Sequence, residues 1–252
     1  MKKLLSLVLS LALAFSLCVP AMAASESMAN FQKTATYNNQ FSDVSASYWA
    51  TPSIKLCYEY GFMKGTTPEQ FSPTGALTVA EAIVMADRLH EIYTTGQSTL
   101  TNGEPWYQTY VDYALENGIV QAGDFTSYTA KATRGQMAYL FSRALPASVL
   151  PSINNVQTLP DVTGSTKYSQ EIFSLYNAGV LTGSDVFGTF KPNDNIIRAE
   201  AAAILTRVAL PEQRKTVVLM KQVQWGNAKI AVPQSAGAGV TENGYFSVSS
   251  QQ

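Results

Sequence analysis

Residues 78–89 read TVAEAIVMADRL, and this stretch decides the fold because the chain contains three versions of it. The second version, at 133–144, reads TRGQMAYLFSRA, and the third, at 197–208, reads IRAEAAAILTRV. In every version, apolar residues recur at positions i, i+3, i+4 and i+7, which is the spacing of one helix face. These residues are Ala82, Met85, Ala86 and Leu89; Met137, Leu140, Phe141 and Ala144; and Ala201, Ile204, Leu205 and Val208. The pattern predicts the same amphipathic helix three times.

The start of each of these helices also repeats. Thr78 with Glu81, and Thr133 with Gln136, have the spacing of a capping box, in which the hydroxyl and the longer side chain satisfy each other's backbone amides. The third version has Ile197 at the Thr position and therefore lacks the hydroxyl cap. One arginine recurs at an equivalent position beside each apolar stripe: Arg88, Arg143 and Arg207. We interpret these side chains either as partners of residues next to the capping boxes or as side chains that lie along the bundle with their charged ends in solvent.

A shorter helix is predicted before each of the three. Gly61, Gly118 and Gly179 are expected to end these helices, because glycine readily adopts the left-handed conformation of a helix C-terminus. Apolar residues stand seven, four and three positions before each glycine: Ile54, Cys57 and Tyr58; Val111, Ala114 and Leu115; and Ile172, Leu175 and Tyr176. The sequence thus predicts three helix-loop-helix units over residues 41–94, 104–145 and 159–210. One helix pair cannot bury its apolar face alone, so we expect a mainly α fold in which three repeats share one core.

The N-terminus has the features of a secretion signal. Lys2 and Lys3 precede an apolar run, and small residues lead to a predicted cleavage site after Ala23. We therefore assign residues 1–23 to a signal peptide, residues 24–40 to an N-terminal segment, and the mature protein to the outside of the cell. No membrane span is expected after cleavage. Cleavage leaves Cys57 as the one cysteine, predicted to be an inert buried thiol.

Residues 216–252 differ in composition from the repeats. Apolar stretches at 217–220 and 228–232 flank the turn signal Trp225-Gly226-Asn227, and a second turn signal stands at Asn243-Gly244. We predict a β-hairpin in this tail. The Gly- and Ala-rich residues 235–239 are expected to form a flexible break.

Composition argues against two classes of function. The 17 basic and 18 acidic residues are dispersed, so there is no basic stripe of the kind that neutralises nucleic acid phosphates. The sole histidine, His90, has no visible nucleophile partner, and Asp112 with Glu116 is interpreted as a solvated acidic pair. No Cys/His cluster suggests a metal site. We therefore predict a protein that is not an enzyme and needs no cofactor or metal.

The loops of the repeats carry a family resemblance. Unit one contains Phe41-Ser42-Asp43-Val44 and Phe71-Ser72-Pro73, and unit three contains Leu159-Pro160-Asp161-Val162 and Phe190-Lys191-Pro192. Unit two lacks both motifs but keeps its box and Trp106-Tyr107. In this order the repeats resemble the S-layer homology family. The resemblance implies a pseudo-trimeric bundle with the second helices at its centre. It also implies non-catalytic binding of a secondary cell-wall polysaccharide, often pyruvylated, that anchors the protein at the bacterial surface.

The resemblance further implies a ligand-binding set at the grooves between repeats: Arg134, Arg198, Asp43, Asp161, Trp49 and Trp106. An arginine at the first helical position, beside amides without helical partners, suits an anion, and an aromatic ring suits a sugar face. Alternatives remain from the residues alone: the arginines pair with carboxylates, the aspartates cap a helix or brace a loop, and the tryptophans anchor the core. Val79 replaces the arginine in unit one and Lys167 replaces the tryptophan in unit three, so we expect one or two working grooves.

Two other functions stay open at this point. One is a structural surface protein that assembles with itself or with a protein partner. The other is an enzyme acting on wall glycans, for which the sequence offers the least support.

Overall fold

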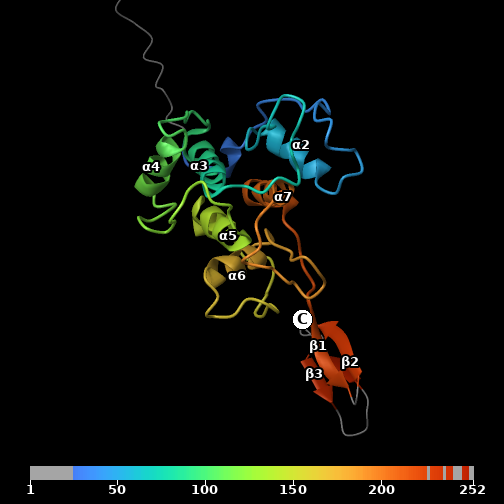
Figure 1. The fold of residues 1–252 in the computed structure, drawn as a ribbon. Coiled ribbons are helices and arrows are strands. Elements are labelled where there is room, and N and C mark those ends of the chain that lie inside the picture. The colour runs from blue at the N-terminus through green and yellow to red at the C-terminus, as the bar shows by residue number, and fades with distance from the viewer. Residues whose placement is uncertain (1–24, 226–227, 235–236, 241–245, 250–252) are drawn as a thin grey trace, which may run out of the picture.

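The computed structural model describes residues 25–225, 228–234, 237–240 and 246–249, so the predicted signal peptide lies outside the described residues. The described chain is a helical body with a small β tail, and this confirms the predicted fold class (Figure 1). Each predicted unit contains two helices: α2 (Thr51–Glu59) and α3 (Val79–Thr95), α4 (Gln108–Glu116) and α5 (Arg134–Arg143), and α6 (Ser169–Asn177) and α7 (Arg198–Ala209).

The helix ends form as their sequences predict. The amide of Glu81 donates to the Thr78 hydroxyl at 3.2 Å, and the Glu81 carboxylate accepts the Thr78 amide at 2.7 Å. Thr133 and Gln136 repeat this box. At α7 the box is half complete, because Glu200 accepts the Ile197 amide while Ile197 has no hydroxyl to return. The three glycines after the shorter helices have φ of +74°, +67° and +75°, as expected for C-terminal caps: Gly61, Gly118 and Gly179.

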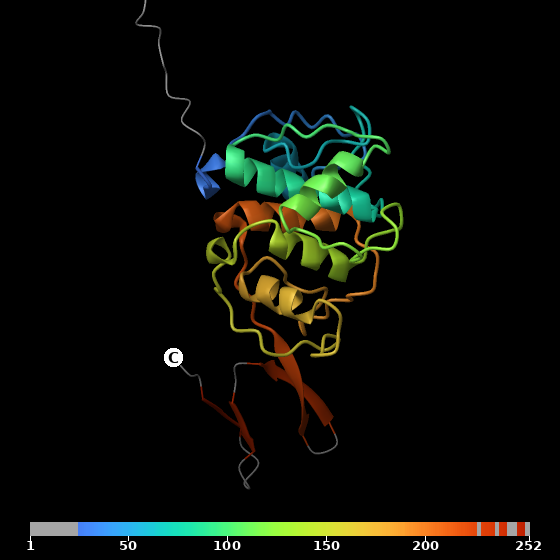
Figure 2. The same cartoon turned by 90° about the vertical axis from the view of Figure 1, so that its left-hand side faces the viewer.

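The helices of one unit do not pair mainly with each other. Instead, the first helix of each unit packs on the second helix of a different unit: α4 on α3, α6 on α5, and α2 on α7 (Figure 1). The last of these contacts joins the start of the body to its end and closes a ring. The central helices also touch, α3 against α5 and α5 against α7. Figure 2 shows α3, α5 and α7 layered through the middle of the body. The predicted bundle of second helices is therefore present.

Three backbone hydrogen bonds join the units at the centre. The amide of Leu77 donates to the carbonyl of Ile196 at 3.0 Å, Ile196 donates to Ala132 at 3.0 Å, and Ala132 donates to Leu77 at 2.9 Å. Each of these buried residues directly precedes the cap of a central helix. The bonds therefore give the body a pseudo-threefold arrangement in which every unit supports the next.

The first amides of the central helices are bonded to carbonyl groups of another unit's loop. Arg134 and Gly135 donate to Asp194 and Pro192, Arg198 and Ala199 donate to Gly75 and Pro73, and Val79 and Ala80 donate to Ala130 and Tyr128, at 2.8–2.9 Å. Amides at a helix start lack helical partners, and here the neighbouring loop supplies them. The expectation that these amides are left to bind an anion is therefore wrong.

The N-terminal segment belongs to the helical body. Its short 3-10 helix η1 (Met28–Asn30) lies on α3, where the Ser27 amide and the Asn30 side chain donate to the Tyr93 carbonyl at 3.0 and 2.7 Å. Phe31 and Tyr37 are buried in the core. Two further 3-10 turns, η2 (Ala147–Val149) and η3 (Pro211–Gln213), follow α5 and α7.

The tail contains two strand pairs below unit three (Figure 2). Strand β1 (Met220–Trp225) pairs antiparallel with β2 (Ala228–Pro233), and β3 (Gly237–Val240) with β4 (Phe246–Ser249). The Met220 amide donates to the Val186 carbonyl at 2.9 Å, which ties β1 to unit three. The hairpin prediction is confirmed, with β1 starting where the predicted strand 217–220 ends. The expected break at 235–239 is wrong for 237–239, which lie in β3; the turn residues 226–227 and 243–244 lie outside the described residues.

Two kinds of feature are missing from the described residues. In that part of the chain, no helix combines the length and apolar character needed to cross a membrane. Nor does it contain a group of three or more His, Cys, Asp or Glu side chains placed to hold a metal ion.

Candidate functional site

Two hollows between the units are built from equivalent residues. Groove A, of about 230 Å³, is lined by Trp106 of unit two, Arg198 of unit three and residues of unit one: Met63, Lys64, Gly65, Glu81, Val84, Met85 and Arg88. Groove B, of about 120 Å³, is lined by Trp49 of unit one, Arg134 of unit two and residues of unit three: Leu181, Thr182, Gly183, Glu200, Ala203, Ile204 and Arg207. Each groove therefore needs all three units, and four of the six predicted site residues line them.

In both grooves, the arginine at the first helical position is held by its neighbour's loop. The Nε of Arg198 donates to the Phe71 carbonyl at 2.8 Å, its Nη2 donates to the Lys64 carbonyl at 2.7 Å, and its guanidinium lies 4.7 Å from the centre of the Phe71 ring. Arg134 repeats this on Phe190, with a bond of 2.7 Å and a ring distance of 5.1 Å. Both side chains are thus fixed in one orientation at a groove wall.

The remaining contact of the arginine differs between the grooves. In groove B, Nη1 of Arg134 forms an ion pair with Glu200 at 2.6 Å. The equivalent Glu81 of groove A instead accepts both the amide and the hydroxyl of Thr78. Groove A is lined by three cations and one carboxylate, whereas groove B is lined by two cations and one carboxylate that is already paired. Groove A is therefore the more electropositive of the two.

The two predicted aspartates brace loops and do not line either groove. Asp43 accepts the amides of Phe71 and Ser72 at 2.8 and 2.7 Å. Asp161 accepts the amides of Phe190 and Lys191 at 2.9 and 2.6 Å. The loop-bracing alternative is therefore the observed arrangement. Each aspartate fixes a loop, and the phenylalanine of that loop holds the groove arginine with its carbonyl group and its ring. The aspartate therefore positions the arginine without lining the groove.

The two tryptophans stand at the rims of the grooves. Trp49 is 57% exposed and Trp106 is 41% exposed, so the alternative that they anchor the core is wrong. Each ring is supported by the preceding or following tyrosine, with centroids 5.8 Å apart for Trp49 and Tyr48 and 5.6 Å apart for Trp106 and Tyr107. Exposed indole rings beside a groove offer flat apolar surfaces to a ligand.

Sequence reasoning missed the role of the recurring arginines. Each donates to the carbonyl that directly follows a helix-ending glycine: Arg88 to Phe62 at 3.1 Å, Arg143 to Ile119 at 3.0 Å, and Arg207 to Val180 at 3.1 Å. Arg88 and Arg207 also line grooves A and B. Burial lowers the pKa of both guanidinium groups. Their recurrence at one position was the available signal: all three bond the backbone after a shorter helix, and two of them also line a groove.

Comparison with known proteins agrees with this geometry. Residues 40–83 and 158–202 match the family model of the S-layer homology domain. These two segments are S-layer homology domains. Domain one contains α2 and the start of α3, and the second matched domain contains α6 and the start of α7. Unit two lies between the two matched segments.

Similar proteins include surface proteins and enzymes. The chain is 28% identical over 216 residues to an endoglucanase of Bacillus sp. (strain KSM-635), covering 81% of this chain and 22% of the relative. It is 24% identical over 210 residues to a surface-layer 125 kDa protein of Lysinibacillus sphaericus, covering 78% and 17%. An amylopullulanase of Thermoanaerobacterium thermosulfurigenes is 26% identical over 177 residues, covering 67% and 9%. The chain therefore spans only a small part of each relative.

At the third position between the units, two aromatic side chains pack against each other. Tyr139 of α5 occupies the place that Val84 and Ala203 hold in the grooves beside the S-layer homology domains, and its ring lies 4.8 Å from that of Tyr168. The Tyr139 hydroxyl donates to Asp124 at 2.5 Å. Lys167, at the tryptophan position, lies with its ammonium 4.7 Å from the centre of the Tyr168 ring. Because Val79 also replaces the arginine, this position lacks the two groups that define grooves A and B.

Proposed function

We propose that the chain is a non-catalytic module that anchors a protein at the bacterial cell surface by binding an acidic wall polysaccharide in grooves A and B. The observation that carries this proposal is the pairing, in both grooves, of an exposed tryptophan with a buried arginine from a different unit. The likeness to surface-layer proteins and to enzymes with other activities supports a shared anchoring part. Unit two acts in this proposal as a third, diverged S-layer homology domain.

The chemistry of the grooves suits an anionic sugar. The indole ring stacks on the apolar face of a pyranose, and the guanidinium groups attract a carboxylate such as that of a pyruvate ketal. Arg134 and Arg198 each use Nε to hold a loop, so the anion is shared with the second arginine of the groove, Arg207 or Arg88. Glu81 and Glu200 can accept bonds from sugar hydroxyls. Binding is then limited to acidic polymers, in line with non-catalytic retention at the wall.

The tryptophans provide a direct test, because each ring is exposed at the rim of its groove. Co-sedimentation of the chain starting at Ala24 with Gram-positive walls is compared for the wild type, Trp49→Ala, Trp106→Ala and the double variant. Each single variant is expected to weaken retention at least about tenfold, because one of the two grooves loses its stacking ring and no longer holds the polymer, and the double variant to abolish it. Val186→Ala, also at an exposed apolar residue but outside both grooves, is the matched control.

Stripping the secondary polysaccharide from the walls distinguishes the alternatives. The proposal requires that binding disappears with the polymer. Equal binding to stripped walls, or oligomers that form without any polymer, would instead favour a structural surface protein that assembles with itself or a protein partner. Release of soluble sugar from the walls would point to an enzyme.

A further inference from the structure

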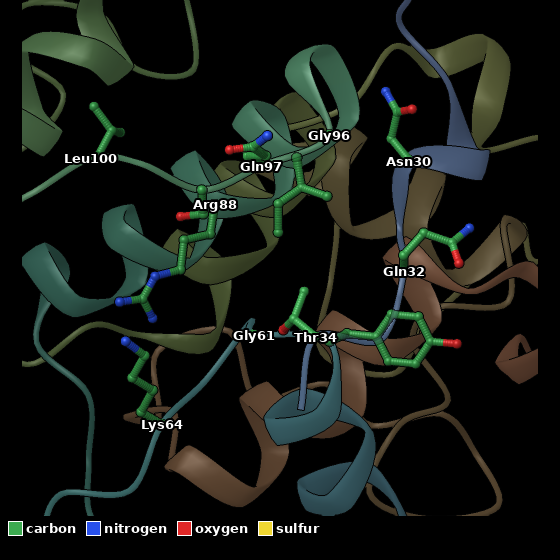
Figure 3. A pocket seen from close by; sticks show the side chains of 12 residues that line it. Asn30, Gln32, Thr34, Gly61, Lys64, Arg88, Gly96, Gln97 and Leu100 are labelled. Carbon is green, nitrogen blue, oxygen red and sulfur yellow. The ribbon is translucent and has the colours of Figure 1, made fainter. Parts of the chain in front are cut away.

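A second cavity lies next to groove A. This cavity C, of about 360 Å³, is enclosed by the N-terminal segment, the residues around Gly61 and the end of α3 (Figure 3). Lys64 and Arg88 line cavity C and groove A alike. The two hollows therefore meet at these two cations, and a chain-like ligand in groove A can continue into cavity C.

The shared wall carries two cations, and the buried Glu91, which interacts electrostatically with Arg88, already accepts the amide and hydroxyl of Thr99. Among the described residues, ion pairs within 4.0 Å join Lys33 to Glu59 and Arg134 to Glu200, and neither Lys64 nor Arg88 has one. Figure 3 shows the charged ends of Lys64 and Arg88 on the same side of cavity C, pointing toward each other. Two neighbouring cations repel each other, and an anion between them removes that cost. The wall therefore favours a ligand with a negative group.

The rest of cavity C offers the contacts that a sugar needs. Thr34, Gln97 and Ser98 supply hydroxyl and amide groups, and the ring of Tyr60 forms part of the wall. This mixture of a few polar groups with one aromatic face is typical of a saccharide subsite. Gln32 and Asn30 continue the polar lining from the N-terminal segment.

The equivalent place in unit three is occupied by the protein itself. There the backbone of Lys215 crosses beside Gly179, and its amide donates to the Gly179 carbonyl at 2.8 Å. A Cβ atom on Gly179 would lie 2.7 Å from the Lys215 oxygen, whereas one on Gly61 would meet only the Thr34 hydroxyl, at 3.4 Å. The chain after α7 thus fills the space that stays open after α3, and cavity C belongs to groove A alone.

We infer that cavity C is a second saccharide subsite that takes the acidic sugar unit next to the one bound in groove A. Groove A then binds two consecutive units of the polymer, and groove B binds one. The inference rests on the proposed function, since cavity C extends a groove that binds saccharide. It also makes the two grooves unequal in the length of polymer that they recognise.

The test fills cavity C and measures the dependence of affinity on ligand length. Ser98 is exposed at the cavity wall, so Ser98→Trp adds bulk there, and Thr34→Trp adds it from the opposite segment. Ser174→Trp, at an exposed position on α6, is the matched control. All three are made in Trp49→Ala, which silences groove B. Calorimetry uses acidic wall-polymer fragments of one and of two repeating units, and circular dichroism checks that each variant is folded.

The expected result is that the two-unit fragment binds at least about tenfold more tightly than the one-unit fragment, a gain of about 1.4 kcal/mol. Both cavity variants should remove this gain and leave one-unit binding unchanged, while Ser174→Trp should keep it. Equal affinity for the two fragments, or a gain that survives both cavity variants, overturns the subsite and leaves the proposed function standing. Failure of Trp49→Ala and of the wild type to bind either fragment overturns the proposed function itself.

Discussion

At the scale of single residues, the side chains that hold the site in shape differ from those that line the grooves. Ser72 and Lys191 adopt positive φ, 58° and 59°, a conformation that side chains other than glycine rarely accept. Asp43 and Asp161 accept the amides of these residues and so hold the strained turns in place. The turns in turn present the phenylalanine carbonyls to the groove arginines. The contribution of these aspartates to the site therefore needs no direct contact with a ligand.

One buried residue of α3 lacks this kind of support. Asp87 is fully buried, and neither of its carboxyl oxygens has a hydrogen-bond partner. Burial, reinforced by the nearby Glu91, raises the pKa of Asp87 to about 9. The equivalent residues Ser142 and Thr206 instead donate to carbonyls of their own helices. The carboxyl group of Asp87 is therefore protonated in the folded protein at neutral pH.

This gives a stability that depends on pH in a definite direction. Because the folded pKa lies above the ordinary value of 3.8, the folded protein keeps a proton that the unfolded chain releases, and the free energy of unfolding falls as pH rises from about 4 to about 9. Asp87→Asn should remove this loss and be more stable than the wild type at pH 8, by on the order of a few kcal/mol, but not at pH 4. Urea unfolding at both pH values measures the difference.

Asp112→Asn is the control, because Asp112 is exposed on α4. It should leave the pH dependence as in the wild type. If Asp87→Asn raises the free energy of unfolding as much at pH 4 as at pH 8, burial of the Asp87 charge is not the cause of the stabilisation.

At the scale of elements, the sequence predicts the helices but not their partners. The 3.6-residue period, the capping boxes and the glycines place the helices of all three units, because these signals act within a few residues of chain. An apolar stripe shows only that a face is buried, so it could not reveal that α2 packs on α7 of another unit. Leu115 illustrates the limit: it belongs to the predicted stripe, yet it is 37% exposed because α4 buries Tyr110, Val111 and Ala114 instead.

The candidate site shows the same limit. The motifs locate the arginines and tryptophans that line the grooves, since these residue types recur at fixed positions. Exposure of Trp49 and Trp106 depends on which unit lies beside them, and the amides at the helix starts are taken by loops from another unit. Both facts arise from contacts between residues far apart in the chain, and the spacing of apolar residues gives no information about such contacts.

The exchange of helices between units predicts cooperative unfolding. Ile54 is fully buried on α2, which closes the ring against α7. Ile54→Ala should lower the free energy of unfolding by about 2–5 kcal/mol, the range for loss of a large buried side chain. Since each unit completes its core with its neighbour, hydrogen exchange should speed up in α4 and α6 together with α2.

The neighbouring Lys55 is exposed, and Lys55→Ala should change neither the stability nor the exchange rates appreciably. Faster exchange confined to α2 and α7 in Ile54→Ala would contradict the closed ring as a single cooperative unit.

At the scale of the whole molecule, the pseudo-threefold body offers three positions for a groove and keeps two. Grooves A and B have lining from every unit, and at the third position Tyr139 and Tyr168 pack against each other. Under the proposed function, two sites on one body would raise the avidity for a polymer with repeated units, because the second contact forms at a high local concentration. Retention of a surface protein then needs only modest affinity at each groove.

This arrangement predicts the number of ligands bound. Calorimetry with a one-unit acidic fragment should give two sites per chain for the wild type, and one site for either Trp49→Ala or Trp106→Ala, because each removes the exposed ring of one groove. Lys167→Ala is the equivalent substitution at the third position, where Lys167 lies over the Tyr168 ring, and it should leave the count at two. A third site that persists when Ser98→Trp fills cavity C, or the loss of one site in Lys167→Ala, would show that the tyrosine pair does not close the third position. A count that stays at two in both tryptophan variants would place the binding elsewhere than in grooves A and B.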